Sequence, residues 1–428
     1  MSAAPQPVVQ QPSVEEFTEE AAAWLGANAT RKPVKTGEGS IVWGDGTFTT
    51  SIFHALSFDD EKALLDDLKR WNQKKAAHGY HAISASPEFG GLGLSKAHAR
   101  AFGKLESEYV TPARHETYSV TIGLIAPSIR AFGTPEQRER WVATFMRTDA
   151  LCCQLFSEPG AGSDLASLAC RAERDGDEWV VNGQKVWSSG AQFSEWGLLI
   201  ARTDPDVGKH AGLTAYVIPM DLPGIEIRPI KQMSGGSSFN EVFFSDVRVP
   251  DSLRLGDIGA GWKVALTVLS FERDHSDSGG NSDARAGGSW RQLLATAQWL
   301  GRTHEPVMRQ KLIDTYIHTR VEHLTNKRAA DLARGGTPGP EGSLGKLLWT
   351  QGMTRIGDVV SELLGPRLIA DTGEWGTYAW TEHLLGAPGY RIAGGSDEVQ
   401  RNIIGERVLG LPGEPRVDKD VSWRDAKR

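Results

Sequence analysis

The stretch "EWVVNGQKVWSS", Glu178 to Ser189, lies between two parts of the chain whose apolar residues follow helical spacing. Its composition favours strands, and Asn182-Gly183 between its two halves is a strong hairpin signal. Further strand-like runs follow, separated by Gly, Pro and Asp: "WGLLIARTD", "GLTAYVIPM", "GIEIRPI" and "EVFFSDVRVP". We therefore predict a small β domain, a sandwich or a barrel, over residues 149–252.

Both flanks of this domain have helical patterns. Residues 13–148 include "FDDEKALLDDLKRWNQKKAAHGY", and Thr134-Pro135 is a helix N-cap followed by proline at the first helical position. Residues 253–428 include the long candidate helix "EPVMRQKLIDTYIHTRVEHLTNKRAADLARG". Residues 1–12 are predicted to be a disordered tail. The order of elements predicts an α+β fold, with a helical domain on each side of the β domain.

Composition excludes several classes of protein. The 428 residues carry a formal charge of −7, which argues against a nucleic-acid or anionic-membrane partner. No apolar run approaches the roughly 18 residues that span a bilayer. The first fifteen residues lack the features of a secretory signal and of a transit peptide, so we expect a cytoplasmic protein. Three cysteines without CxxC, and histidines without ligand spacing, predict neither disulfides nor a metal site.

A Gly-rich stretch, "FSEPGAGSD", lies at the start of the β domain. It is not the dinucleotide fingerprint, because Leu165 replaces the third glycine. Ser157, Ser163 and free backbone N–H groups could hold polar edges of a ligand; the alternative is a structural loop joining domains.

Trp187 stands two residues before Ser189, so both side chains point to one face of a strand. An aromatic ring beside a hydroxyl could flank a planar cofactor, and the alternative is a tryptophan of the core.

An acidic residue, Glu272, occurs late on an apolar helix in "SFERDH". It shares the helix face of Ala265, Val268 and Leu269, because they precede it by seven, four and three residues. A carboxyl group on an apolar face has a raised pKa and can act as a base near neutral pH. The alternative is that the helix ends here and Glu272 pairs with Arg273 in solvent.

The stretch "YRIAGGSDEVQRNIIGERVLGLP", Tyr390 to Pro412, predicts a tight turn that leads into a helix. Ser396 is a suitable N-cap, and acidic residues follow it where a helix start favours negative charge. Gly394-Gly395 indicates a backbone that another group approaches closely, or only a turn.

Six segments together resemble the acyl-CoA dehydrogenase family, from about residue 14 to the C-terminus. They occur in the family's order: "SPEFGGLGL" (86–94), "FGTPEQRERW" (132–141), "CQLFSEPGAGSD" (153–164), "NGQKVWSSGA" (182–191), "VRVPDSLRLGDIGAGWKVAL" (247–266) and "GGSDEVQRNIIGERVLGLP" (394–412). The resemblance implies an N-terminal helical bundle, a middle β domain and a C-terminal four-helix bundle. It also implies FAD bound between the last two domains and a neighbouring subunit, usually in a homotetramer.

The reaction implied by the resemblance is the α,β-dehydrogenation of an acyl-CoA thioester to the trans-2-enoyl-CoA, a step of fatty acid or steroid catabolism by β-oxidation. A carboxylate takes the α-proton, and flavin N5 takes the β-hydride. The electrons then leave to an electron-transferring flavoprotein.

The resemblance also assigns roles to residues of this sequence. The loop from Gln154 to Ser163 would contact the flavin, with Phe156 and Ser157 closest, and Ser163 would bind the CoA part of the substrate. Trp187 would shield the flavin face and Ser189 would bond near N5. The residues on the FAD pyrophosphate side would be Ser396, Asp397 and Glu398. The backbone of Gly394, beside Gly395, would bind the thioester carbonyl.

The catalytic base is where this sequence departs from many family members. They carry a glutamate at the position that aligns with Gly394, which has no side chain. Isovaleryl- and long-chain-type members instead carry the base in an "ER" pair on the helix after the β domain, and Glu272-Arg273 matches that pair. We therefore predict Glu272 as the base, with Arg273 beside the substrate. The alternatives are a non-catalytic FAD-binding partner subunit, as in some actinobacterial steroid-degrading members, or an oxidase of the same fold.

Other departures concern the adenine end of FAD and the acyl group. The family's R-x-x-F-G segment is replaced by the neighbourhood of Arg309, and its Gln-x-x-Gly-Gly by "ELLGP", which contains Glu362 and Gly365. These changes are compatible with a homotetramer, a homodimer or an α2β2 assembly. The Gly-rich stretch 276–289 is predicted to break the helix after Glu272 and to admit a bulky, branched or ring-bearing acyl group.

Overall fold

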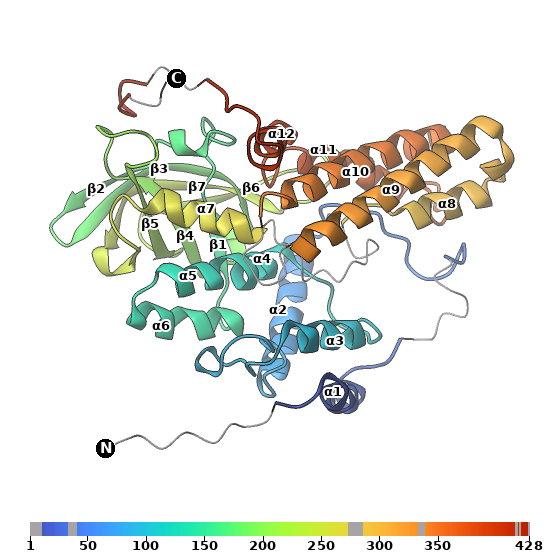
Figure 1. Ribbon diagram of the computed structural model, residues 1–428, viewed down its shortest axis with the longest axis horizontal. Helices are drawn as coiled ribbons and strands as arrows, with labels where there is room; N and C mark the ends of the chain where they lie inside the picture. Colours follow the sequence, from blue (N-terminus) through green and yellow to red (C-terminus); the bar gives the residue numbers. More distant parts are fainter. Residues whose placement is uncertain are drawn as a thin grey trace.

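The computed structural model describes residues 11–32, 41–272, 286–332, 339–415, 418 and 421–426, except for the side chain of Glu272. Residues 1–10 of the predicted tail lie outside the described residues, as do Arg273 and residues 276–285 of the Gly-rich stretch. Helices, strands and helices follow one another along the chain in the predicted order (Figure 1). The predicted α+β class is therefore confirmed.

The N-terminal helices are amphipathic and bury one face each. They are α1 (Val14–Asn28), α2 (Phe58–Ala76), α3 (Lys96–Glu106), α4 (Glu116–Ser119), α5 (Ala126–Phe132) and α6 (Pro135–Met146). On α1, Phe17, Ala21 and Leu25 recur every four residues, and they are buried with Phe102 of α3. A π-helical segment, Val120–Ile125, joins α4 to α5.

The start of α6 confirms the predicted cap. The Thr134 hydroxyl accepts a hydrogen bond from the Gln137 amide at 3.3 Å, and the Gln137 side chain accepts one from the Thr134 amide at 3.1 Å. We expect Thr134→Ala to lower the free energy of unfolding by about 1 kcal/mol, because a helix amide loses its partner. Urea unfolding measures this, with Thr134→Ser as the control that keeps the cap. An unchanged midpoint in Thr134→Ala would contradict the assignment.

The middle of the described chain forms one eight-stranded sheet in the order β6-β7-β3-β2-β4-β5-β8, with β1 pairing parallel to β4. The strands are β1 (Cys152–Leu155), β2 (Arg171–Asp175), β3 (Glu178–Ser189), β4 (Trp196–Arg202), β5 (Leu213–Pro219), β6 (Ile225–Ile230), β7 (Phe239–Pro250) and β8 (Arg254–Leu255). Nearly every residue of β4 and β5 is buried, as expected of central strands covered on both faces.

The predicted hairpin at Asn182-Gly183 is wrong. Strand β3 runs through this pair, and the chain turns earlier, at Gly176 between β2 and β3. The pairing of β3 with β7 instead shifts register between Val181 and Gly183. Gly183 has φ of +148°, and a Cβ there would lie 2.7 Å from Cys170 Cα. The Asn-Gly pair therefore forms an irregularity where two backbones meet closely, a use of glycine that local sequence does not separate from a turn.

An ion pair beside the end of β7 gives the sheet domain a pH dependence. Hydrogen bonds from Arg254, and one from the Trp179 indole, hold the pKa of Asp251 at about 2. Because the folded-state pKa is depressed, the pair stabilises the protein above pH about 4 and loses its contribution as pH falls toward 2. We expect Asp251→Asn to be less stable than the parent at pH 7 and equal to it near pH 2. A constant difference from pH 7 to pH 2, measured by urea unfolding, would contradict this.

The C-terminal helices form the predicted four-helix bundle. It consists of α8 (Trp290–Trp299), α9 (Pro306–Leu332), α10 (Gly342–Leu364) and α11 (Trp380–Tyr390), and α9 and α10 extend side by side away from the sheet (Figure 1). Residues from all four helices share one buried cluster, including Leu293, Leu312, Val360 and Trp380. The short α12 (Asp397–Ile403) follows, at the end of α10 nearer the sheet.

Helix α7 (Gly261–Glu272) packs on the sheet domain rather than inside the bundle. Val264, Ala265 and Val268 are fully buried in the core that the sheet shares with α5 and α6. Glu272 lies four residues after Val268 and seven after Ala265, on the face that those residues bury. The backbone of α7 thus carries Glu272 along the surface where the sheet meets the helical domains.

A segment of the N-terminal domain, residues 43–54, crosses onto the C-terminal bundle; we call it the crossing segment. Trp43 stacks on Trp299 with ring centroids 4.5 Å apart, and the Thr50 hydroxyl donates to the Ala379 carbonyl at 2.6 Å. Phe53 stacks on Tyr390 at 5.1 Å. Segments far apart in sequence therefore meet where the bundle approaches the sheet.

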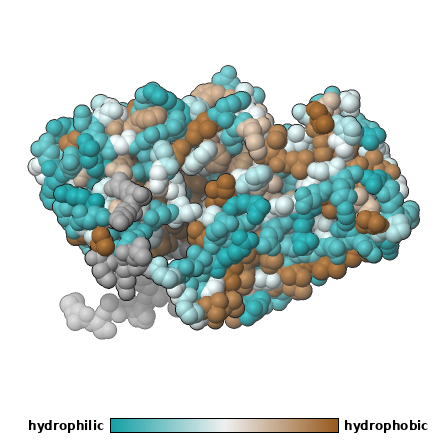
Figure 2. Space-filling view, turned by 90° about the horizontal axis from the view of Figure 1, so that it is seen from above, coloured by the Kyte–Doolittle hydropathy of each residue, from teal (hydrophilic) through white to brown (hydrophobic). Residues whose placement is uncertain are grey.

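The outer face of α9 is apolar and exposed. Its exposed residues recur at helical spacing: Ile313, Ile317, Val321 and Leu324. Figure 2 shows hydrophobic residues gathered along the edges of the bundle. A stripe of this kind is typical of a surface that another chain covers. Among the described residues, no helix combines the length and hydropathy that crossing a membrane requires.

Candidate active site

The loop from Gln154 to Ser163 is fixed to strand β3 by a buried ion pair. Lys185 is fully buried, and its Nζ donates to the Phe156 carbonyl at 3.0 Å and to Glu158 Oε1 at 2.8 Å. The carboxylate of Glu158 also accepts bonds from the amides of Ala169 and Cys170. The loop is therefore held rigidly from inside.

The end of β3 carries Trp187 beside this loop. The Val186 amide donates to the Ser157 carbonyl at 2.9 Å, which brings the loop next to the strand. Trp187 is 58% exposed, so the alternative of a core tryptophan is wrong. It has φ of +62°, a genuine outlier for a bulky residue, and the β3–β7 register shifts around it between Lys185 and Ser188. Such strain is found at functional sites.

These residues fit a planar cofactor. The exposed indole of Trp187 lies beside the rigid loop, and half-buried Ser189 is two residues further along the chain. The ring of Phe239 contacts Trp187 edge-on, with ring centroids 6.0 Å apart. Phe156 is buried and Ser163 is exposed at the outer part of the loop. The arrangement can hold one face of a flat ring against the strand and leave Ser163 free for a second ligand.

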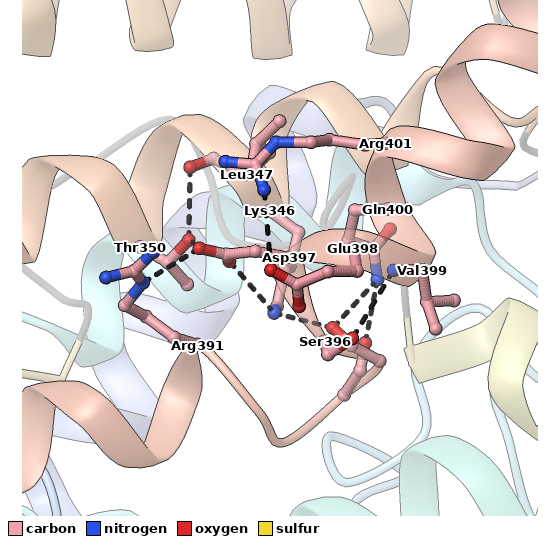
Figure 3. Close-up of polar contacts among 12 residues, drawn as sticks. Lys346, Leu347, Thr350, Arg391, Ser396, Asp397, Glu398, Val399, Gln400 and Arg401 are labelled. Atoms are coloured by element: carbon pink, nitrogen blue, oxygen red, sulfur yellow. Dashed lines mark hydrogen bonds and ion pairs between the residues drawn. The ribbon is translucent and has the colours of Figure 1, made fainter. Parts of the chain in front are cut away.

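The turn at Gly394-Gly395 is held by polar contacts from α10 and α12 (Figure 3). Both glycines have left-handed backbone, with φ of 66° and 84°. The Gln400 side chain donates to both of their carbonyls, at 3.0 and 3.2 Å, and Lys346 Nζ donates to the Gly395 carbonyl at 2.7 Å. Gly394 therefore lies in a conformation that a glutamate adopts only with strain.

The three predicted pyrophosphate residues have different surroundings. Ser396 caps α12 by accepting from the Val399 amide, and Glu398 is exposed beside Arg401. Asp397 is buried, and its carboxylate accepts from Thr350 at 2.9 Å and from Arg391 at 2.8 Å (Figure 3). Both oxygens of Asp397 are thus engaged inside the chain, where the carboxylate fixes the turn. Sequence reasoning missed both partners: Thr350 comes from the distant α10, and Arg391 directly follows α11, six residues before Asp397.

The residues predicted at the adenine end of FAD lie away from the Gly394 turn. Arg309 is exposed near the start of α9, Glu362 pairs with Lys311, and Gly365 ends α10 with φ of +50°. Lys346, which contacts the Gly394 turn, is at the other end of α10, roughly 24 Å from Glu362 at the rise of an α-helix. Within one chain the residues predicted at the adenine end are therefore far from the Gly394 turn.

A polar cluster that sequence reasoning missed lies between the crossing segment and α4. His54, Glu61 and His115 place their ring nitrogens and carboxylate oxygen within 4.8 Å of one another. Their positions in the sequence follow no ligand spacing, so the pattern of histidines did not indicate this site. The cluster is the strongest candidate for a second site in the described part of the chain.

Comparison with known proteins identifies one protein family along the chain. Residues 53–149, 153–247 and 259–409 match the acyl-CoA dehydrogenase N-terminal, middle and C-terminal domains. The chain is 38% identical over 357 residues to acyl-CoA dehydrogenase IpdE1 of Mycobacterium tuberculosis (strain ATCC 25618 / H37Rv), covering 83% of this chain and 91% of that protein. Glu272, Trp187 and Gly394 all fall within the matched domains.

Solved structures share the fold. The Tcur3481-Tcur3483 steroid ACAD has a TM-score of 0.71 and 24% identity, covering 95% of this chain and 99% of that chain. The ChsE4-ChsE5 complex from Mycobacterium tuberculosis has a TM-score of 0.69 and 25% identity, covering 96% of this chain and 100% of that chain. With the three domains matched in order, this chain belongs to the acyl-CoA dehydrogenase family of FAD-dependent flavoproteins.

Proposed function

We propose that the chain oxidises an acyl-CoA thioester to the trans-2-enoyl-CoA, with Glu272 as the base. The observation that carries this proposal is the position of Glu272 on the buried face of α7, together with the absence of a side chain at Gly394. The Glu272 carboxylate takes the proton from the carbon next to the thioester carbonyl. The Gly394 amide donates to the carbonyl oxygen, where negative charge develops.

Other residues hold the reactants. FAD supplies the acceptor for the hydride from the β-carbon. Trp187 would cover the flavin ring, Ser189 would donate a hydrogen bond to it, and Ser163 would bind the CoA part of the thioester. Gln154, Phe156 and Ser157 line the ring from the loop that Lys185 anchors. An electron-transferring flavoprotein would then accept the electrons, as is usual for the family.

The acyl group is proposed to carry a ring. A row of aromatic side chains in mutual contact, Phe239, Phe53 and Tyr390, leads from Trp187 toward the Gly394 turn. Flat apolar faces suit a ring system better than a flexible chain, because the ring loses less conformational freedom on binding. One similar structure is titled a steroid ACAD, which supports the same substrate class.

A second candidate function is that of a non-catalytic FAD-binding subunit. It is favoured by the glycine at the position of the usual base and by structural neighbours whose titles name two components. The apolar face of α9 offers a surface for a second copy or for a related subunit, in a homotetramer, a homodimer or an α2β2 assembly. Arg309, Glu362 and Gly365 would then approach a flavin of a neighbouring subunit.

An anaerobic titration of the purified flavoprotein separates these functions. Straight-chain, branched and ring-bearing acyl-CoAs are added in turn, and the flavin absorbance is followed. We expect ring-bearing thioesters to bleach the flavin. Bleaching by none of them, with FAD still bound, would favour the non-catalytic subunit, and peroxide release in air during turnover would favour an oxidase.

A further inference from the structure

The polar cluster of His54, Glu61 and His115 is a hydrogen-bonded triad and not a metal site. The His115 Nδ1 atom accepts a hydrogen bond from the Thr117 amide at 3.2 Å, so the ring proton lies on Nε2. That Nε2 lies 2.9 Å from Glu61 Oε1 and donates to it. A metal ion would need the lone pair of this nitrogen, and metal-binding histidines use their other ring nitrogen as a donor. The cluster therefore joins the crossing segment, α2 and the start of α4.

A different arrangement surrounds the outer part of the loop that carries Ser163. Residues 162–164 are exposed, and the buried Lys185–Glu158 pair holds the loop only from inside. Contacts at the outer part therefore decide where the Ser163 hydroxyl lies. The next residue, Asp164, supplies one of them, since its two carboxylate oxygens lie 3.0 and 3.1 Å from Lys209 Nζ. Lys209 thus fixes the chain directly after Ser163.

The rest of this outer part, residues 164–168, is held by Arg202 at the end of β4. Arg202 is buried, its Nε donates to the Leu168 carbonyl at 3.0 Å, and one of its Nη atoms donates to the Ala166 carbonyl at 2.6 Å. A guanidinium group stays charged and presents its donors in a fixed plane, so it requires acceptors when it is buried. The position of Arg202 therefore sets the path of the backbone after Ser163.

Trp423, from the last described residues, contacts both Arg202 and the backbone that Arg202 holds. The Arg202 Cζ atom lies 4.4 Å from the centroid of the Trp423 ring, which is a cation–π contact. The Trp423 indole Nε1 donates to the Ser167 carbonyl at 3.2 Å. One side chain thus covers the guanidinium group and adds a hydrogen bond to the same stretch of backbone.

Trp423 belongs to a segment that we call the strap, formed by residue 418 and residues 421–426. Figure 1 shows this segment, in dark red, beside the sheet domain. The amides of Trp423 and Arg424 donate to two carbonyls of the loop between β4 and β5, at 2.8 and 3.0 Å. Asp418 pairs with Lys209 of that loop at 2.6 Å. The strap therefore shares Lys209 with Asp164 and connects the β4–β5 loop to the loop of Ser163.

We propose that the strap positions the loop that binds the CoA part of the thioester, with Trp423 as the positioning residue. The strap fixes residues 164–168 and thereby the Ser163 hydroxyl, and it acts through these residues and not by contact with the substrate. A loop that is already ordered loses less conformational freedom when its ligand binds, so the strap raises the affinity for CoA. The inference rests on the proposed function for the role of Ser163. The strap itself lies beyond residues 259–409, the last of the matched domains.

The test measures binding of coenzyme A to the full chain by equilibrium dialysis, independently of flavin reduction and of the acyl group. We expect Trp423→Ala to weaken binding about tenfold, because the loop must then be ordered by the ligand. The rate of flavin reduction at saturating thioester should stay unchanged, because the loop holds CoA and not the reacting atoms. Trp423→Phe, which keeps a ring over Arg202 but lacks the indole N–H, should show an intermediate affinity.

The matched control is a tryptophan with a similar contact in another domain. Trp375 also donates its indole N–H to a backbone carbonyl, that of Gly46 at 2.7 Å, but it lies beside the C-terminal bundle. Trp375→Ala should bind coenzyme A like the parent. The FAD content and the urea midpoint of each variant report whether it has folded. Weaker binding in Trp423→Ala with an equal loss of FAD would show a general loss of structure and would overturn the inference.

A double variant tests whether Trp423 acts through Ser163. If it does, Ser163→Ala combined with Trp423→Ala should bind coenzyme A no more weakly than the weaker of the two single variants. Losses that multiply in the double variant would overturn the inference.

The outcomes distinguish this inference from the proposed function. Equal binding of coenzyme A by the parent and Trp423→Ala, with normal flavin bleaching by thioesters, would overturn the inference and leave the proposed function standing. Binding that depends on Trp423, without bleaching by any thioester, would support the inference and refute the proposed reaction. A parent chain that does not bind coenzyme A would overturn both.

Discussion

Glu272→Gln is expected to slow flavin reduction by acyl-CoA about 10²- to 10⁴-fold, with FAD still bound. An amide cannot accept the α-proton, and no side chain at Gly394 can replace it. The effect should appear in the rate of bleaching under anaerobic single turnover and not in the affinity for the thioester, because the substitution preserves shape. The loss of a proton acceptor acts on the transition state alone.

The matched control for this prediction is Glu272→Asp. It keeps a carboxylate but retracts it by one methylene, so we expect a smaller loss of rate. A Glu272→Gln protein that bleaches at the parental rate would show that the base is elsewhere. A parent and variant that both fail to bleach would instead favour the non-catalytic subunit.

Glu158→Gln is expected to lower the free energy of unfolding by about 3–5 kcal/mol, the cost of leaving a buried charge without its partner. Lys185 is fully buried, and after the substitution its ammonium group would keep the Phe156 carbonyl but lose the carboxylate. Urea unfolding followed by tryptophan fluorescence measures the change. Since Glu158 also holds the loop that carries Phe156 and Ser157, the variant should retain less FAD.

The control for the ion pair is the double variant Glu158→Gln with Lys185→Met. Removing both charges should recover part of the lost stability, because the uncompensated ammonium group is gone. A double variant whose loss of stability equals the sum of the losses in Glu158→Gln and Lys185→Met would mean that the charges act independently. In that event the rigidity of the loop would have another origin.

Local patterns were sufficient for the order of the elements and for the starts of two helices. Thr134 and Ser396 cap helices where the sequence predicts caps, because capping depends on residues within one turn. The apolar spacing of α7 correctly predicted a face that buries Ala265 and Val268. Six ordered motifs also indicated the family, since glycine turns and caps at fixed spacing encode backbone geometry directly.

Contacts between distant segments account for what sequence reasoning missed. Asn182-Gly183 forms a register shift against β7 instead of a turn, where Cys170 lies close to Gly183. Trp187 is exposed because the strand is irregular there. The carboxylate of Asp397 points inward because the distant α10 supplies Thr350, which adds to the nearby Arg391.

The polar cluster is the clearest case of such a contact. His54, Glu61 and His115 meet only when the crossing segment, α2 and α4 pack together. The sequence alone encodes which residues repeat, cap and turn, because those preferences act over a few positions. Local patterns in the sequence do not reveal which side chains meet across the interior, because the packing of whole elements sets those distances.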